Sequence, residues 1–207
     1  MTKIIDNNFI KSLVDQLRHT GTQPADFYRI TLTISQLLTY EALKYEEYSS
    51  APIPVWTGDQ YSATTFNQKQ LVILPILRAG IGMLDGVRHL LPAAQVQILG
   101  MYRNEDTLEP VWYYNKLPES MHSLHAVLVD PMLATGGSLS DAVRELKRHN
   151  CARITILAIV ASPEGISRLE AEAPDVNIYV AALDKCLNDN GYIIPGLGDA
   201  GDRIFNT

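Results

Sequence analysis

The sequence predicts an α/β fold built on a doubly wound, mostly parallel sheet. Two observations support this prediction: short apolar runs rich in Val, Ile and Leu recur after residue 70, and amphipathic segments separate them. Continuous apolar runs are typical of strands that are covered by helices on both faces. Alternation of strand and helix along the chain is the pattern from which parallel sheets are built. We therefore expect one central sheet between two layers of helices.

The expected elements follow in chain order. N-terminal helices are predicted over 9–19 and 24–45, the second with apolar residues every three or four positions and Pro24 in its first turn. Residues 46–70 mix proline, glycine and β-branched residues, so only short strand pieces and loops are expected there. The expected strands are 71–77, 96–102, 125–130, 154–161 and 177–183, and the expected later helices are 80–91, 137–149 and 164–173.

The segment 103–118, "RNEDTLEPVWYYNKLP", is too polar and too long for a crossover helix, so we expect a protruding hairpin arm there. Its aromatic run at 111–114 is expected to pack on the arm or at a subunit contact rather than to stack on bases. The sequence contains no repeat, low-complexity tract or linker, and we assign residues 1–207 to a single domain.

The composition limits the possible partners and compartments. A net charge of −6 argues against a nucleic-acid partner, because non-specific binders carry a basic surface that displaces phosphate counterions. No segment resembles a signal peptide or approaches the ~20 apolar residues of a membrane span, so we expect a cytoplasmic protein with no membrane partner. Cys151 and Cys186 form no CxxC motif and are expected to be ordinary thiols. His122 and His125 lack a third ligand, so no protein-built metal site is expected.

Candidate binding residues lie where predicted strands end, because ligands of such sheets bind beyond the carboxyl ends of the strands. In "VDPMLATGGS", Asp130 ends a strand, and Gly136 and Gly137 precede a helix. The free N–H groups of that helix, with glycines that let the backbone approach, would bind a phosphate, and Asp130 would accept hydrogen bonds from sugar hydroxyls. The alternative is a structural N-cap formed by Ser138 or Thr135.

Three further strand ends or loops are candidates. Arg78 follows an apolar run and would pair bidentately with a diphosphate, with Gly80 and Gly82 permitting close approach; the alternative is a surface arginine. Arg103 ends another run, where the alternative is a solvated charge cluster. The glycine-rich stretch 191–205 predicts neither helix nor strand, and it indicates either a backbone-lined pocket or a tail that closes over the sheet edge.

Five blocks together resemble the uracil phosphoribosyltransferase family, in order and at suitable spacing: "PILRAGIGMLDG", "GMYRNEDTLEP", "VDPMLATGGS", "PEGI" and "GYIIPGLGDAGDRIF". The resemblance implies the type I phosphoribosyltransferase fold and a reaction of pyrimidine salvage. In that reaction uracil and 5-phosphoribosyl 1-diphosphate, the phosphoribosyl donor, give UMP and diphosphate. The resemblance implies that the donor is bound by Arg78, Arg103, Asp130, Pro131, Met132, Leu133, Ala134, Thr135, Gly136, Gly137, Ser138 and Asp199. It implies that uracil is bound by Ile193, Gly198, Asp199 and Ala200. The implied catalytic residues are Arg78, Arg103, Asp130 and Asp199.

The resemblance also implies Mg²⁺, a homo-oligomer (dimer or tetramer) and, in parts of the family, GTP as activator. Because Pro131 follows Asp130 where many phosphoribosyltransferases have a second acid, Mg²⁺ is expected mainly on the diphosphate. Phe27-Tyr28 departs from the family's Phe-Arg, and residues 46–70 align with no block. Two alternatives are a pyrimidine-sensing, RNA-binding regulator of the same fold, against which the acidic net charge argues, and a catalytically silent homologue.

Overall fold

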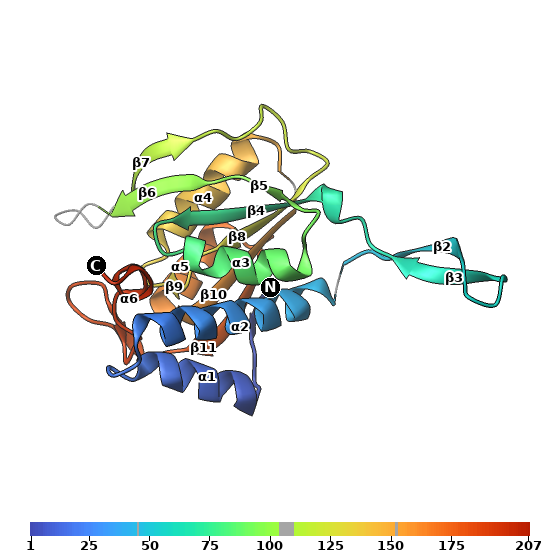
Figure 1. Cartoon of the computed structure of the whole chain (residues 1–207). Helices are drawn as coiled ribbons and strands as arrows, with labels where there is room; N and C mark the ends of the chain where they lie inside the picture. The colour runs from blue at the N-terminus through green and yellow to red at the C-terminus, as the bar shows by residue number, and fades with distance from the viewer. Residues whose placement is uncertain (45, 104–109, 152) are drawn as a thin grey trace.

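The computed structural model describes residues 1–44, 46–103, 110–151 and 153–207. Within them, a nine-stranded sheet lies between two layers of helices, which confirms the predicted α/β class (Figure 1). The pairs in this sheet are parallel, except that the edge strand β7 runs antiparallel to β6. The main path of the sheet is β1 (Thr2–Ile4), β11 (Asn177–Leu183), β10 (Arg153–Ala161), β8 (His125–Val129), β4 (Leu71–Leu77), β6 (Leu99–Arg103) and β7 (Pro110–Asn115), with β5 (Gln95–Val96) beside β4 and β9 (Met132–Leu133) beside β10.

Each face of the sheet has its own buried apolar cluster. Successive residues of a strand point to opposite faces, and in β8 the side chains of Val127 and Val129 enter one cluster while Ala126 and Leu128 enter the other. This double burial explains the continuous apolar runs in the sequence. The helices α1 (Asn8–Arg18), α2 (Pro24–Leu43), α3 (Ile81–Leu90) and α6 (Ala200–Phe205) cover one face, and α4 (Gly137–Arg148) and α5 (Pro163–Glu172) cover the other.

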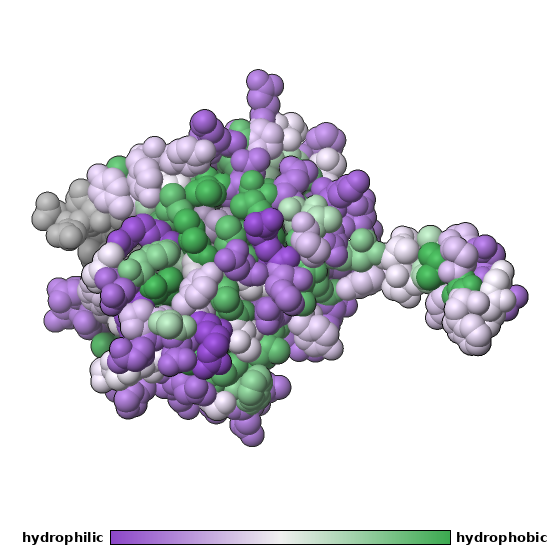
Figure 2. Space-filling model, viewed as in Figure 1, coloured by the Kyte–Doolittle hydropathy of each residue, from purple (hydrophilic) through white to green (hydrophobic). Residues whose placement is uncertain are grey.

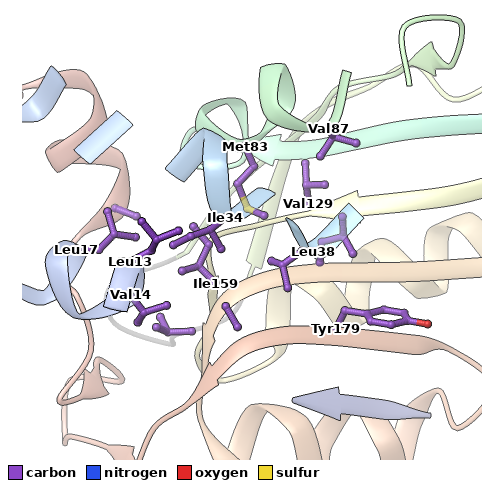
Figure 3. Close-up of a cluster of buried hydrophobic side chains, with 14 of the residues drawn as sticks. Leu13, Val14, Leu17, Ile34, Leu38, Met83, Val87, Val129, Ile159 and Tyr179 are labelled. Atoms are coloured by element: carbon purple, nitrogen blue, oxygen red, sulfur yellow. The ribbon is translucent and has the colours of Figure 1, made fainter. Parts of the chain in front are cut away.

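The helix α1 is amphipathic and packs against α2. It begins at Asn7, whose side chain accepts hydrogen bonds from the N–H groups of Phe9 and Ile10. Its apolar residues Leu13, Val14 and Leu17 are buried, and Figure 3 shows them beside side chains of α2 and the sheet. The last turn of α1 is thereby fixed beside the C-terminal segment of the chain (Figure 1).

The short strands and loops expected over 46–70 are present, but their pairing into one hairpin was not foreseen. β2 (Ser49–Pro54) and β3 (Gln60–Thr65) pair along their whole length in an antiparallel hairpin. This β2–β3 arm projects from the body of the protein, and apolar residues lie on its surface (Figures 1 and 2). The short 3-10 helix η1 (Gln68–Gln70) leads from the arm into the sheet. Prolines in and near β2 lower strand propensity, so local sequence conceals a hairpin that is made by cross-strand pairing.

The hairpin expected at 103–118 is confirmed in part, because β7 pairs antiparallel with β6. Residues 110–115 form β7 and extend the main sheet at its edge, whereas residues 104–109 lie outside the described part of the chain. The strand expected over 96–102 is divided into β5 and β6. The edge strand β1 was not predicted, because three residues of the N-terminus carry too little pattern to indicate a strand.

The C-terminal stretch 191–205 contains regular structure, which corrects the expectation of neither helix nor strand. β13 (Ile193–Ile194) pairs antiparallel with β12 (Cys186–Leu187), and α6 follows. The helix α6 is capped by Asp199, whose side chain accepts a hydrogen bond from the N–H of Asp202 at 3.0 Å. An aspartate at this position was the sequence signal for the start of the helix. Among the described residues, no helix is both long and apolar enough to cross a membrane.

Candidate functional site

A cleft of about 1160 Å³ opens beyond the carboxyl ends of β4, β6 and β8. This is the position at which parallel sheets bind ligands, because helix N-termini and strand-end loops meet there. The C-terminal segment that leads into α6 forms one wall of the cleft. The predicted site residues that line it are Arg78, Asp130, Met132, Leu133, Ala134, Thr135, Gly136, Gly137, Ser138, Ile193, Gly198 and Asp199.

The loop before α4 presents backbone N–H groups to this cleft. Gly136 is the N-cap residue, with φ +76°, and no side chain in the described part of the chain caps the helix there. The nearest substitute is a bond of 3.4 Å from the N–H of Gly137 to the Thr135 hydroxyl. Among the described residues Ser138 caps no N–H of this helix, so that part of the structural alternative is wrong, whereas Thr135 does accept this one long bond. A helix N-terminus left open in this way attracts anions through its free N–H groups and its dipole.

The first turn of α5 supports this loop from behind. The hydroxyl of Ser162 donates to the carbonyl oxygen of Ala134 at 2.7 Å and accepts from the N–H of Gly165 at 2.9 Å. A Cβ on Gly165 would lie 2.2 Å from the same carbonyl oxygen of Ala134. Ser162 was not predicted from the sequence, although the neighbouring block "PEGI" pointed to this turn. The hydroxyl and the missing Cβ together fix how closely this loop packs against the start of α5.

Three aspartates line the cleft, Asp130, Asp189 and Asp199, and two of them, Asp130 and Asp199, interact electrostatically. Asp130 follows β8 directly, and its side chain accepts a hydrogen bond from the N–H of Met132 at 3.1 Å. Burial, and to a lesser degree the charge of Asp199, raise the pKa of Asp130 to about 7, whereas the bond from Met132 opposes the rise. The pair leaves this part of the cleft suited to hydroxyl donors and cations.

Arg78 lies at the opposite wall, just beyond β4. Its Nη2 donates to the carboxylate of Asp202 at 2.7 Å, and the two side chains are 59% and 46% exposed. No motif in the sequence marks Asp202 as a partner of Arg78. The expectation that Gly80 and Gly82 admit a ligand was wrong, since added Cβ atoms would lie 2.5 Å and 2.4 Å from protein atoms of β8 and α6. These glycines allow α3 to pack closely.

The wall formed by residues 189–198 contains three glycines, at 191, 196 and 198. Gly196 and Gly198 have φ values of +63° and +80°, which favour glycine. A Cβ on Gly196 would lie 2.2 Å from the carbonyl oxygen of Ile193, whereas at Gly198 the nearest atom, in the Arg203 side chain, would be 3.5 Å away. Gly198 is thus open toward the cleft, and Gly196 closes a tight turn.

Two predicted residues, Pro131 and Ala200, do not present a side chain to the cleft. Pro131 is buried, and its carbonyl oxygen accepts from the N–H groups of Ile159 and Val160 at 3.1 and 3.0 Å. Ala200 is fully buried in the apolar cluster below α6, so only its main chain can take part in binding. Arg103 ends β6, and its side chain lies outside what the structure describes.

The sequence analysis also missed an aromatic pair at the edge of the cleft. Tyr102 in β6 and Tyr113 in β7 pack against each other with their ring centroids 6.4 Å apart. Both rings remain more than half exposed. The aromatic run at 111–114 was the signal, but periodicity alone did not indicate which of its residues faces the ligand side.

The residues of the cleft fit a magnesium ion that arrives with a ligand. Within the described ranges, no cluster of three or more His, Cys, Asp and Glu side chains could hold a metal ion. The carboxylates of Asp130 and Asp199 are the oxygen donors that Mg²⁺ prefers, and the charge of Asp199 raises the pKa of Asp130. A cation brought by a diphosphate would relieve this repulsion.

Known proteins share the sequence and the fold. The family model described as uracil phosphoribosyltransferase matches residues 4–207. The chain is similar to the AQ2163 protein of Aquifex aeolicus, with 38% identity and a TM-score of 0.94 over 99% of this chain and 98% of that chain. Two more distant structures share the fold alone. A hypoxanthine-guanine phosphoribosyltransferase of Bacillus anthracis has 9% identity and a TM-score of 0.50, over 76% of this chain and 79% of that chain. TT1426 of Thermus thermophilus has 15% identity and a TM-score of 0.51, over 84% of this chain and 96% of that chain.

Proposed function

Because the chain belongs to the uracil phosphoribosyltransferase family and is a phosphoribosyltransferase, we propose that its acceptor is uracil and that it makes UMP in pyrimidine salvage. The observation that carries this proposal is the meeting of two unlike surfaces in one cleft. An open helix N-terminus at Gly136 suits a phosphorylated ribose. The main chain around Gly198 suits the polar edge of a flat base, because Gly198 lines the cleft and carries no side chain.

The donor would lie along the loop 130–138. The N–H groups at the start of α4 and the hydroxyls of Thr135 and Ser138 bind the 5′-phosphate. The ionised carboxylate of Asp130 accepts hydrogen bonds from the ribose hydroxyls. Arg78 and Arg103 pair with the diphosphate, since a guanidinium fork matches its oxygen atoms. This arrangement puts C1 of the ribose in the middle of the cleft.

The base would be read by main-chain groups of residues 193–200. Uracil presents an acceptor at O2, a donor at N3 and an acceptor at O4 along one edge. Peptide N–H, C=O and N–H groups complement this order without any side chain. Cytosine reverses the last two groups, so that buried peptide groups would be left unpaired.

The reaction replaces one bond at C1 of the ribose with another. The bond from C1 to the diphosphate oxygen breaks, the bond from C1 to N1 of uracil forms, and the proton on N1 is released. Positive charge develops on the ribosyl group and negative charge on the leaving diphosphate. The chain contributes by holding both substrates in line and by stabilising the diphosphate with Arg78 and Arg103. Mg²⁺ bound to the diphosphate would neutralise further charge, with Asp130 and Asp199 as the available carboxylates.

We also propose a homo-oligomer, a dimer or tetramer, with the β2–β3 arm at the subunit contact. Trp56 at the tip of the arm is 97% exposed, and Tyr61 and Ile53 are 61% and 42% exposed. Exposed apolar side chains on a projecting hairpin are stabilised when a second subunit covers them. Sedimentation of the wild type and of Trp56→Ser tests this.

GTP activation stays a prediction of the resemblance, and turnover with and without GTP checks it.

The experiment for the proposed function is uracil-dependent release of diphosphate by the purified protein, with UMP identified as the product. We expect turnover with uracil and the phosphoribosyl donor, and none when either is omitted. Turnover with another base but not with uracil would refute uracil as the acceptor, while the chain would still be a phosphoribosyltransferase. Absence of turnover together with nucleotide-dependent RNA binding would favour the regulator of the same fold.

A further inference from the structure

An ion pair outside the cleft holds the turn behind the base-binding wall. Arg18, the last residue of α1, donates to both carboxylate oxygens of Asp184 at 2.8 and 2.5 Å. The same guanidinium donates to the carbonyl oxygen of Gly196 at 2.7 Å. The carboxylate in turn accepts the N–H of Gly196 at 2.9 Å. Both main-chain polar groups of Gly196 are therefore bound by this one pair.

The pair is shielded from water. The side chain of Asp184 is only 3% exposed and that of Arg18 is 21% exposed. A fork-shaped, bidentate contact between a guanidinium and a buried carboxylate fixes geometry as well as distance. A lysine could supply the charge of Arg18 but could not reach both carboxylate oxygens and a carbonyl oxygen together.

A second arginine makes the reverse connection, from α6 to α1. Arg203 donates to the carbonyl oxygens of Leu17 and, at 2.8 Å, His19, which lie at the end of α1. It also donates to the carbonyl oxygen of Leu197 at 2.8 Å, and its guanidinium lies 4.3 Å from the centroid of the Phe27 ring. Helix C-termini leave carbonyl oxygens without partners, and Arg203 satisfies them while it reaches the turn.

The two arginines thus bind successive carbonyl oxygens of one turn, at Gly196 and Leu197. This turn connects the two ends of the proposed base-binding wall, Ile193 and Gly198. Its residues lie outside the nine-stranded sheet. Contacts from α1 and α6 therefore decide where the peptide groups of the wall point.

We propose that Arg18 and Arg203 are positioning residues, which set the affinity of the cleft for its base from outside the cleft. The inference rests on the proposed function, because the wall they hold is the one assigned to uracil. It makes α1, a helix that lines no part of the cleft, a determinant of base binding.

The test compares two ligands by calorimetry: UMP, which contacts the wall and the phosphate loop, and ribose 5-phosphate, which contacts the loop alone. The variants are Arg18→Lys and the double change Arg18→Met with Asp184→Asn, which avoids an unpaired buried charge. We expect both variants to bind UMP at least about tenfold more weakly than the wild type does. Their affinity for ribose 5-phosphate should change by less than about twofold. The matched control is Arg29→Gln, which removes an exposed arginine paired with Asp26.

Hydrogen exchange of the ligand-free variants gives a readout that does not depend on the ligand. We expect faster exchange at the amide of Gly196 and its neighbours than in the wild type, and no change in the central strands. Equal losses for UMP and ribose 5-phosphate, or unchanged exchange at the turn, would overturn the inference. A wild type that binds UMP no better than ribose 5-phosphate would overturn the proposed function instead, and exchange alone would then decide the role of Arg18.

Discussion

Arg78, at the end of β4, donates a hydrogen bond to the carboxylate of Asp202 in α6 at 2.7 Å. Half-exposed pairs of this kind stabilise a fold by about 1 kcal/mol or less, because water solvates both groups well. The guanidinium can therefore exchange Asp202 for an anionic ligand at little cost. Arg78 lines the cleft, and in the proposed binding mode the diphosphate of the donor would compete with Asp202 for its guanidinium.

We predict that Asp202→Asn increases the affinity for the phosphoribosyl donor by about two- to fivefold, since it removes a competing negative charge worth up to about 1 kcal/mol. Arg78→Ala should lower the same affinity by about tenfold or more, because a charge-assisted bidentate contact is lost. Calorimetry with the donor measures both, and Asp26→Asn on α2 is the exposed control. Weaker donor binding by Asp202→Asn would mean that Asp202 orients Arg78 rather than competes for it.

Asp130→Asn should leave the fold intact and lower kcat/KM for the donor by about tenfold or more. The amide offers one acceptor and an unwanted donor group to the ribose hydroxyls, in place of a charged acceptor. The defect should be larger at pH 8 than at pH 6, because the carboxyl, with its pKa of about 7, is mainly protonated at pH 6. Circular dichroism controls for folding. A variant with wild-type kcat/KM would exclude Asp130 from ribose binding.

The same carboxyl predicts how stability changes with pH. Its pKa in the folded protein, about 7, lies above the value of 3.8 for the unfolded chain, so between these values the folded state binds the proton more tightly. The stability of the ligand-free wild type should therefore fall as pH rises from about 4 to 7, and this contribution should be constant above 7.

In Asp130→Asn the carboxyl is gone, so this fall in stability with rising pH is absent. The free energy of unfolding of the variant should rise relative to that of the wild type by about 1–4 kcal/mol between pH 4 and pH 8. Urea titrations of both proteins at each pH give the difference. A difference that stays constant across this range would show that the pKa of Asp130 is not raised.

The sheet and the helices that flank it could be predicted from the sequence because burial on both faces leaves continuous apolar runs, as in β8. The β2–β3 arm could not, since its stability comes from pairing between segments that separately carry weak strand signals. The same holds for Arg18 and Asp184, which meet only in the folded chain and show no local motif.

The candidate site was predicted wherever the backbone itself carried the signal. Glycines after a strand indicated the loop at Gly136, and the acid before them indicated Asp130. Sequence could not distinguish glycines that face the cleft from those that allow packing, and Gly80 and Gly82 proved to be the second kind. Asp202 was missed because an acid in a helix carries no sign of its partner.

Gly165→Ala should distort the proposed phosphate-binding loop, residues 130–138, from the side of α5. The added methyl group would lie 2.2 Å from the carbonyl oxygen of Ala134, so the loop or α5 must move. We expect a stability loss of about 1–3 kcal/mol, as for other overpacked sites, and a weaker binding of ribose 5-phosphate. Ser167→Ala, on the exposed side of α5, is the control and should change neither. Unchanged ribose 5-phosphate affinity in Gly165→Ala would show that the loop does not hold the phosphate.

The central claim is that main-chain groups of residues 193–200 select uracil. The most direct measurement is kcat/KM for uracil, 5-fluorouracil and cytosine with the same donor, in the wild type and in Gly198→Val. We predict that uracil and 5-fluorouracil are both accepted and that uracil is preferred over cytosine by about 10²–10⁴, since two unpaired peptide groups cost about 1–3 kcal/mol each. The valine variant, in which a side chain enters the open position at Gly198, should lose activity toward uracil. Comparable kcat/KM for cytosine, or an unaffected valine variant, would contradict the claim.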